Sequence, residues 1–411
     1  MPSATLGPAV LEALERSVHR AADSYATMLH LNANENIVTP RVMRILGTPL
    51  GHRYLMDASR PICVFGRNAA FKGMPEVAEL LEAGVLALRR MLGAEAVTLG
   101  CLSGLQAMTS VLLAATQPGD TVMTVASSQG GHHSTEQVLR RAGRRHTGTA
   151  YDRDAGNFDV AEIAHRAVRD GVSALYLDTS VLLVPPPLRE LRAALPADIT
   201  IISDASHVLG LILGGVFPNP LDEGADIVCG STHKTFPGPH KGIVAVRDGE
   251  RFTDVLTTIQ GTLVSSVHTA PTLALAMALV EFEEYGGAYA RQVTANAAAL
   301  GHNLRANGLL VRESPAGGIS RTHQVHCYVS DERDRALEKC LANGIATSVS
   351  GALGDRRFLR LGVQEATMRG MRESQMATVA GLIRAALAGE NRRADVRLLT
   401  QRHPNASYGA A

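Results

Sequence analysis

Two residues with complementary chemistry, Asp204 and Lys234, each follow an apolar segment with the composition of a β-strand. The segment ITIISDASHVLG contains Asp204, and DIVCGSTHKTFPGPHKG contains Lys234. Because ligands bind at the carboxyl ends of the strands in an open parallel sheet, we expect both side chains to face one pocket. Burial there favours the neutral lysine amine, which attacks an aldehyde to form an imine. A carboxylate facing a pyridine nitrogen keeps that nitrogen protonated, so the ring accepts electrons from a carbanion.

A third segment, TLGCLSGLQAM, places Ser103 and Gly104 at the start of a predicted helix, where free backbone N–H groups attract phosphate. Each of these signals also has a structural interpretation. A single aspartate at a strand end is more often a turn former or a helix cap, and a single lysine is usually solvated. His132 and His207 taken alone are more often structural, and Ser103 with Gly104 is most often a plain cap. The ordered combination of the segments favours the functional interpretation.

The elements that would position these residues alternate between strand and helix. Five β-rich segments between residues 121 and 247 predict strands: TVMTVA, ALYLDT, ITIISDA, DIVCGS and GIVAVR. The stretches between or beside them, such as GLQAMTSVLLAATQ, DVAEIAHRAVRDG and LRELRAALP, have helical periodicity. This alternation is typical of βαβ units, so we expect an α/β fold with a mainly parallel sheet that is covered on both faces.

The rest of the chain predicts an arm and a second, smaller domain. Residues 8–30 have apolar positions at helical spacing, residues 75–92 predict an amphipathic helix, and residues 271–308 are Ala-rich and helical. Two short strands, in THQVHCYVS and RFLRLGV, and a last helix in MATVAGLIRAALAG predict an α+β unit. We therefore expect an arm at residues 1–45, a large cofactor-binding domain at 46–270 and a small domain at 271–411. The last 20 residues have the composition of a frayed tail.

Composition excludes several classes of protein. The 411 residues are 45% hydrophobic, and 40 basic against 39 acidic residues give a net charge of +1, so nucleic acid and anionic membranes are poor partners. The five cysteines have no Cys-x-x-Cys spacing, which argues against disulfides and a zinc site, and we expect no metal. Neither a signal peptide nor a membrane-spanning run is recognisable, so we expect a soluble cytoplasmic protein.

At these segments the chain resembles serine hydroxymethyltransferase and its relatives, the fold-type I enzymes that depend on pyridoxal 5'-phosphate (PLP). The resemblance covers about residues 28–365 and is carried by LNANENIVTPRVM, GTPLGHRY, SGLQAM, QPGDTVM, QGGHH, SDASHVLGLILGGVFPNPL, STHKTFPGP and LRLG. The resemblance implies a PLP-binding large domain, a smaller C-terminal domain and a homodimer or tetramer with active sites at the subunit interface. STHKT and DASH are the most specific of these motifs.

The resemblance also implies roles for individual residues. Lys234 would be the Schiff-base lysine, Asp204 would pair with the pyridine nitrogen, and His132 would stack on the cofactor ring. The phosphate would be held by Ser103, Gly104, Ser231 and His233, and His207 would lie near the phenolic oxygen. Arg360, in FLRLG, would clamp the substrate carboxylate with its bidentate guanidinium group. Tyr54 would reach the active site from the neighbouring subunit, where residues 265–271 would add a phosphate contact.

The departures from the family pattern lie on the substrate side. The family's catalytic glutamate falls on Met56 here, and the neighbouring Asp57 has a shorter side chain that is a possible substitute. The family's Ser-Glu-Asn reads Asn34-Glu35-Asn36, which alters a polar contact beside the substrate carboxylate. The loop before Arg360 is shortened to SVSGALGDRR, and VQEAT replaces the Thr-Pro-Ala that usually follows. The cofactor motifs are intact, whereas the missing groups serve the folate one-carbon unit.

This asymmetry predicts Cα–Cβ chemistry on a β-hydroxy amino acid without tetrahydrofolate. The pattern resembles L-threonine transaldolases, which cleave L-threonine to acetaldehyde and join the glycine fragment to another aldehyde. One rival is a tetrahydrofolate-dependent hydroxymethyltransferase acting on serine or α-methylserine, with Asp57 or Glu35 replacing the lost glutamate. An amino acid epimerase of the same family is a second rival, and a catalytically dead regulator that keeps the fold is a third. The sequence leaves the acceptor aldehyde open.

Overall fold

The computed structural model describes residues 8–54, 75–152, 155–329, 333–353 and 356–408. Among these residues, seven strands form the main sheet in the order β2-β10-β9-β8-β7-β3-β4. The strands are β2 (Ala96–Thr98), β3 (Thr121–Thr124), β4 (Arg145–Gly148), β7 (Val172–Leu177), β8 (Thr200–Asp204), β9 (Ile227–Ser231) and β10 (Gly242–Val246). β4, β3, β7, β8 and β9 are parallel, whereas β10 runs antiparallel to both of its neighbours. The mainly parallel α/β fold is thus confirmed.

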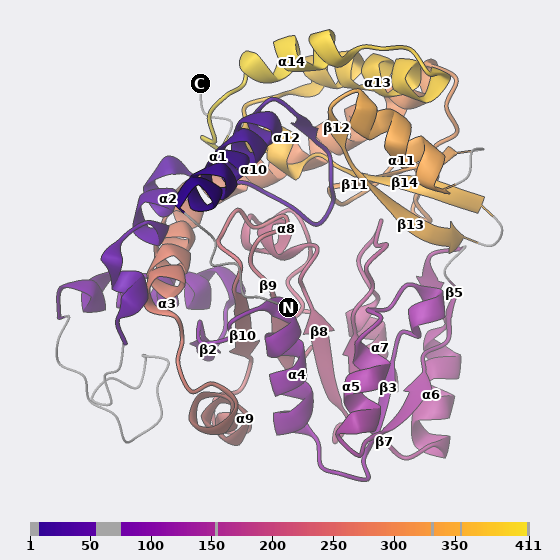
Figure 1. Cartoon of the computed structure of the whole chain (residues 1–411). Coiled ribbons are helices and arrows are strands. Elements are labelled where there is room, and N and C mark those ends of the chain that lie inside the picture. The colour runs from indigo at the N-terminus through magenta and orange to yellow at the C-terminus, as the bar shows by residue number, and fades with distance from the viewer. Residues whose placement is uncertain (1–7, 55–74, 153–154, 330–332, 354–355, 409–411) are drawn as a thin grey trace, which may run out of the picture.

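Helices cover the main sheet, and a second unit lies above the sheet in the view of Figure 1. The helices of this part are α3 (Ala78–Leu92), α4 (Gly104–Ala115), α5 (Thr135–Arg141), α6 (Val160–Arg169), α7 (Leu188–Ala194), α8 (Leu209–Leu213) and α9 (Thr253–Thr258). Short 3-10 turns occur at Pro49–His52, Pro75–Val77 and Ser127–Gln129, and a π-helical turn at Ile259–Leu263. A two-stranded hairpin, β5 (Tyr151–Asp152) with β6 (Asn157–Phe158), flanks the sheet.

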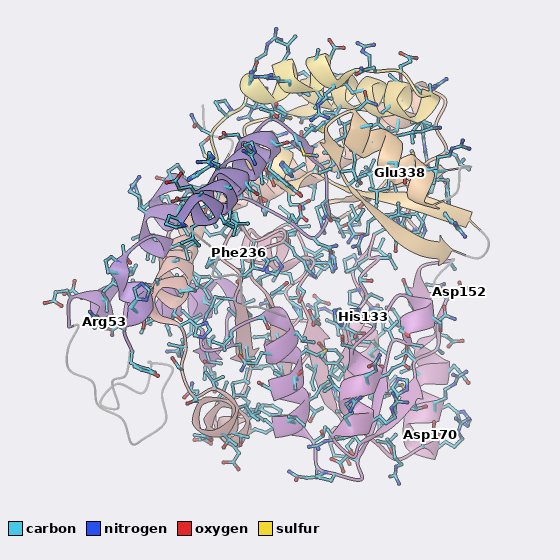
Figure 2. All side chains as sticks on the ribbon, viewed as in Figure 1. Arg53, His133, Asp152, Asp170, Phe236 and Glu338 are labelled. Atoms are coloured by element: carbon cyan, nitrogen blue, oxygen red, sulfur yellow. The ribbon has the colours of Figure 1, made fainter. Side chains whose placement is uncertain are left out.

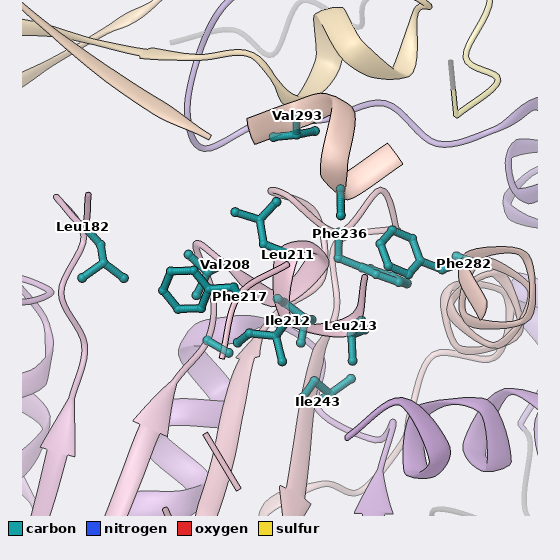
Figure 3. Packing of buried hydrophobic residues seen from close by; sticks show 14 of the residues in the cluster. Leu182, Val208, Leu211, Ile212, Leu213, Phe217, Phe236, Ile243, Phe282 and Val293 are labelled. Carbon is teal, nitrogen blue, oxygen red and sulfur yellow. The ribbon is translucent and has the colours of Figure 1, made fainter. Parts of the chain in front are cut away.

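The longest helix, α10 (Thr269–Ala306), connects the two units and packs against α2 (Pro40–Leu46), α3 and α8. Gly84 permits the contact with α3, because a Cβ atom there would lie 2.5 Å from the Cα of Ala276. On the α8 side, Leu211 lies near Val293 of α10, and Phe236 packs beside Phe282 (Figure 3). The expected boundary between residues 270 and 271 falls in the first turn of α10, and the division into domains stays a prediction.

The upper unit has an antiparallel sheet of β11 (Gln324–Val329), β14 (Arg356–Gly362) and β13 (Ser348–Leu353). Its helices are α11 (Arg333–Ala342), α12 (Gln364–Met368), α13 (Glu373–Ala388) and α14 (Arg393–Gln401). β1 (Leu29–His30) pairs in parallel with β12 (Ile345–Ala346), so the N-terminal segment is attached to this unit. This arrangement confirms the smaller α+β unit.

The frayed tail expected for the last 20 residues is wrong for those that are described. Residues 393–401 form α14, whose Val396 and Leu399 are buried, and Tyr408 packs beside Phe282 and Tyr289. The apolar positions of α14 are three apart and suffice to dock the helix despite its high content of arginine. By contrast, α1 (Pro8–Ala26) has the predicted helical pattern and no buried residue.

Candidate active site

A cavity of about 730 Å³ opens at the carboxyl ends of β7, β8 and β9, below the small antiparallel sheet. The predicted site residues other than Tyr54 and Asp57 all line it, and they are Asn34, Ser103, Gly104, His132, Asp204, His207, Ser231, His233, Lys234 and Arg360. The parallel pairing of β8 with β9 brings the segments that contain Asp204 and Lys234 together. Asp204 lies opposite Cys229, and β9 ends two residues later at Ser231. The convergence expected from the strand order is therefore present, whereas the individual roles stay predictions.

Lys234 is half-buried and lines this cavity, and its Nζ lies 3.2 Å from Nε2 of His207. Burial lowers the pKa of the Lys234 amine to about 8, although the nearby Asp204 opposes the shift and Arg360 adds to it. A buried amine with this pKa is in part neutral near physiological pH, and the neutral amine is the nucleophile.

Two neighbours fix the carboxylate of Asp204. The hydroxyl of Tyr176 donates to Oδ2 at 2.6 Å, and the backbone N–H of Ser206 donates to Oδ1 at 2.8 Å. Burial raises the pKa of Tyr176 well above its usual value, so its hydroxyl stays a donor. These hydrogen bonds fix the orientation of the Asp204 side chain. Tyr176 was not predicted as a site residue, because a tyrosine inside an apolar strand resembles any other core position.

The wall between α4 and β9 has the character of an anion site. The Oγ of Ser231 and the Nδ1 of His233 are buried and have no hydrogen-bond partner among the described residues. Ser103 caps α4 by accepting from the N–H of Gln106 at 3.1 Å. A Cβ atom on Gly104 would lie 2.6 Å from the Cβ of Ser231, so only glycine allows the helix to approach β9 this closely. Unpaired polar atoms beside a helix N-terminus fit the phosphate of the predicted cofactor.

His132 lies in a loop that is held by a buried acid, Asp178. The Oδ2 of Asp178 accepts from the N–H of His132 at 3.2 Å and from the Thr135 hydroxyl at 2.6 Å. Burial is the main reason that the pKa of Asp178 rises to about 7. Its Oδ1 is buried without a partner among the described residues, and Asp178 lines the cavity. His133, the next residue after His132, lies between the main sheet and the small unit (Figure 2).

Asp178 was missed from the sequence although a signal was present. It directly follows β7, just as Asp204 ends β8, and both positions lie at the ligand-binding edge of the sheet.

Arg360 reaches the cavity from β14. Its Nη1 donates to the carbonyl oxygen of Ser180 at 3.0 Å, while its Nε is buried without a partner among the described residues. Burial lowers the pKa of Arg360 to about 10, so the guanidinium group remains charged at neutral pH. A partly unpaired buried guanidinium group fits a carboxylate ligand.

The remaining predicted residues do not meet the cavity in this chain. Tyr54 is 60% exposed and does not line it, and Asp57 lies outside the described residues. Glu35 is exposed and accepts a hydrogen bond from Asn32 at 2.7 Å instead of facing the cavity. Asp178 and Asp204 are the carboxylates among the described residues that line it.

Among the described residues, no helix is both long and apolar enough to cross a membrane. No cluster of at least three His, Cys, Asp or Glu side chains in the same ranges has the geometry to hold a metal ion.

Comparison with known proteins gives a consistent result. A family model described as serine hydroxymethyltransferase matches residues 5–383. Fluorothreonine transaldolase from Streptantibioticus cattleyicolor is 35% identical over 92% of this chain, which spans only 60% of that longer protein. Serine hydroxymethyltransferase from Methanopyrus kandleri is 34% identical, with 93% of this chain and 90% of that protein covered. The crystal structure of L-threonine transaldolase from Pseudomonas fluorescens superposes with a TM-score of 0.89 at 30% identity and covers 97% of this chain and 93% of that one.

Proposed function

Because this chain belongs to the serine hydroxymethyltransferase family and is therefore a PLP-dependent enzyme, we propose that it is an L-threonine transaldolase that needs no folate. It would break the Cα–Cβ bond of L-threonine and release acetaldehyde. The glycine fragment would then form a new bond from its Cα to the carbonyl carbon of a second aldehyde, which becomes the β-hydroxyl-bearing carbon. When bound, PLP delocalises the electron pair left on Cα between these two events.

The observation that carries this proposal is the chemistry of the cavity wall. Asp178 and Asp204 are the only carboxylates that line the cavity among the described residues, and hydrogen bonds of the protein engage Oδ2 of Asp178 and both oxygens of Asp204. The family's catalytic glutamate position is occupied by Met56, which lies outside those residues. The names of two relatives, a fluorothreonine transaldolase and an L-threonine transaldolase, support the same reaction.

The cavity residues have separate tasks in the proposed reaction. The neutral amine of Lys234 would hold the cofactor through its aldehyde group. Asp204, held by Tyr176, would pair with the pyridine nitrogen, while Arg360 would bind the substrate carboxylate. His132 would support the ring, and Asp178 holds the His132 loop. Ser231 and His233 would bind the phosphate, since Oγ of Ser231 and Nδ1 of His233 have no hydrogen-bond partner among the described residues.

The experiment is incubation of the purified enzyme with L-threonine and benzaldehyde in the absence of folate. We expect acetaldehyde and a β-hydroxy-α-amino acid that carries the phenyl group, in equal amounts. Reactions without L-threonine, or with the Lys234→Ala enzyme, are the controls. Turnover of L-serine or α-methylserine that requires tetrahydrofolate, with none in the threonine reaction, would replace the proposal with a hydroxymethyltransferase.

We also propose a homodimer that works in the cytoplasm. The apolar face of α1 supports the dimer, since Leu11 is 59% exposed, Leu14 55% and Val18 68%. Four buried cysteines are free thiols, which supports a reducing compartment. Sedimentation equilibrium of the full chain tests the assembly, and a monomeric mass at micromolar concentration would contradict it.

A further inference from the structure

A row of buried polar side chains connects Lys234 with Arg312, which lies alongside β11 and whose backbone N–H donates to the carbonyl oxygen of His326. The Nζ of Lys234 lies 3.2 Å from Nε2 of His207, and Nδ1 of His207 lies 3.2 Å from Nε2 of Gln324. The Oε1 of Gln324 lies 2.9 Å from Nε2 of His326, whose Nδ1 is 3.5 Å from Nη1 of Arg312. Gln324 and His326 are fully buried, and His207 and Arg312 nearly so. We call these four side chains the relay.

The Arg312 end of the relay sets the direction of its hydrogen bonds. A guanidinium group only donates, so Nδ1 of His326 must accept. Burial, with Arg312 and Arg360 nearby, holds the pKa of His326 well below its usual value, so the ring is neutral and carries one proton. That proton is therefore on Nε2, which donates to the Oε1 of Gln324.

An independent contact fixes the same orientation of the Gln324 amide. Its Nε2 lies 3.1 Å from the carbonyl oxygen of Ser180, and a carbonyl oxygen only accepts. The amide nitrogen must therefore face Ser180, as the His326 contact also requires. Its second N–H points to Nδ1 of His207, so this ring nitrogen accepts as well.

The last step concerns the amine. Burial, together with Lys234 and Arg360, holds the pKa of His207 well below its usual value, so this ring also carries one proton. Because Nδ1 accepts from Gln324, the proton resides on Nε2 and points at the Nζ of Lys234. Nζ can accept this hydrogen bond only with a lone pair, and an ammonium group has none.

We propose that Arg312, His326 and Gln324 are positioning residues that lock His207 as the Nε2–H tautomer and thereby favour the neutral, nucleophilic form of the Lys234 amine. The inference rests on the proposed function only for the role of Lys234. Other groups that act on the charge of Lys234 or His207 are Asp204 on β8, Arg360 on β14, His132 and His323. Asp204 favours the ammonium form, so the relay opposes it.

The relay is tested by two substitutions at Gln324. In Gln324→Glu, the carboxylate presents an acceptor both to His326 and to His207. The proton of His207 should therefore move to its Nδ1, and its Nε2 should accept a hydrogen bond from the ammonium form of Lys234. Gln324→Leu has similar volume and no charge, and should leave His207 as a mixture of tautomers. Gln401→Glu, an exposed site on α14, adds the same charge outside the relay and serves as the control.

Two measurements on the full-length chain read the outcome without turnover. Nitrogen-15 NMR of labelled histidine reports the His207 tautomer, and a His207→Asn variant assigns the signal. Competitive acetylation of the cofactor-free chain, followed by mass spectrometry, reports the neutral fraction of Lys234. We expect Nε2–H in the unaltered protein, and about tenfold slower labelling of Lys234 at neutral pH in Gln324→Glu, with a smaller decrease in Gln324→Leu.

A His207 ring protonated on Nδ1 in the unaltered protein, or equal labelling of Lys234 in all variants, would overturn the relay. The proposed transaldolase activity would survive that result. Conversely, the expected tautomer in an enzyme that fails to release acetaldehyde would overturn the proposed function and leave the relay intact.

Discussion

The Lys234 side of the cavity comes from two neighbouring strands, whereas the Arg360 side is assembled from distant parts of the chain. Asp204 ends β8 and Lys234 follows β9, so the register of one parallel pair places both. Arg360 lies on β14 of the upper unit and is held by a carbonyl oxygen that follows β7, and Asn34 comes from the N-terminal segment. Asp204 and Lys234 are thus placed by the pairing of neighbouring strands, and Arg360 and Asn34 by the packing of two units.

The largest effect is expected from Lys234→Ala, which removes the only group proposed to bond the cofactor. Turnover and the visible absorbance of the bound cofactor should both be lost. The fold should persist, because burial lowers the pKa of Lys234 to about 8 and its ammonium form is therefore unfavourable in the folded chain below that pH. In the absence of added cofactor, the melting temperature at neutral pH should be unchanged or higher than that of the cofactor-free unaltered chain, as followed by circular dichroism.

Lys339→Ala is the matched control, since Lys339 lies in α11 and donates to the carbonyl oxygen of Leu387. It should keep its colour and activity. A Lys234→Ala enzyme that keeps its cofactor absorbance and its activity would show that another amine binds the cofactor. It would contradict the assignment of the Lys234 side of the cavity to the cofactor.

A smaller effect is expected on the other side of the cavity. Arg360→Ala should raise the KM for L-threonine about 30-fold, since a charge-assisted pair contributes about 2 kcal/mol. The absorbance of the bound cofactor should be retained, because the cofactor side does not depend on Arg360. Arg357→Ala, an exposed arginine on the same strand, is the control in steady-state kinetics. An unchanged KM in Arg360→Ala would mean that the carboxylate is bound elsewhere.

The smallest effect on activity is expected at Asp178, which supports the His132 loop, so its test is one of stability. Its pKa rises from 3.8 to about 7 in the folded chain, so between these values the unfolded chain releases a proton that the folded chain keeps. The free energy of unfolding should therefore fall as pH rises through this range. The amide of Asp178→Asn does not titrate. The free energy of unfolding of this variant, relative to that of the unaltered protein, should therefore rise by up to about 4 kcal/mol between about pH 4 and about pH 8.

Urea unfolding at the two pH values measures this difference. Asp198→Asn changes an exposed aspartate and should show the same pH dependence as the unaltered protein. If Asp178→Asn also retains the pH dependence, Asp178 is ionised in the folded chain and the electrostatic description of the His132 loop is wrong.

The sequence predicted the parts of the fold that depend on local pattern. Apolar strands that end on Asp204 and Ser231 indicated the parallel pair and its ligand-binding edge, and the Ser103 cap indicated the start of α4. The antiparallel direction of β10 was not predicted, because an apolar run has the same composition in either direction.

Residues that position another site residue were not predicted from the sequence. Tyr176 lies inside β7 and Gln324 begins β11, and their contacts with Asp204 and His207 depend on neighbouring strands and on the position of the upper unit. The spacing of Gln324 and His326 places both on one face of β11, but spacing alone does not say what that face meets. Docking of α14 likewise depends on a tertiary surface.

The helix α10 is part of the packing of both units. It packs against α3 and α8 of the lower unit and against α12 and α13 of the upper one. A fragment that stopped at residue 270 would leave Gly84 facing water instead of Ala276, with the apolar stripe of α3 uncovered. Neither half is therefore a suitable piece for separate expression or for exchange with a relative, and gene fusions that graft only one of them should carry the whole helix along.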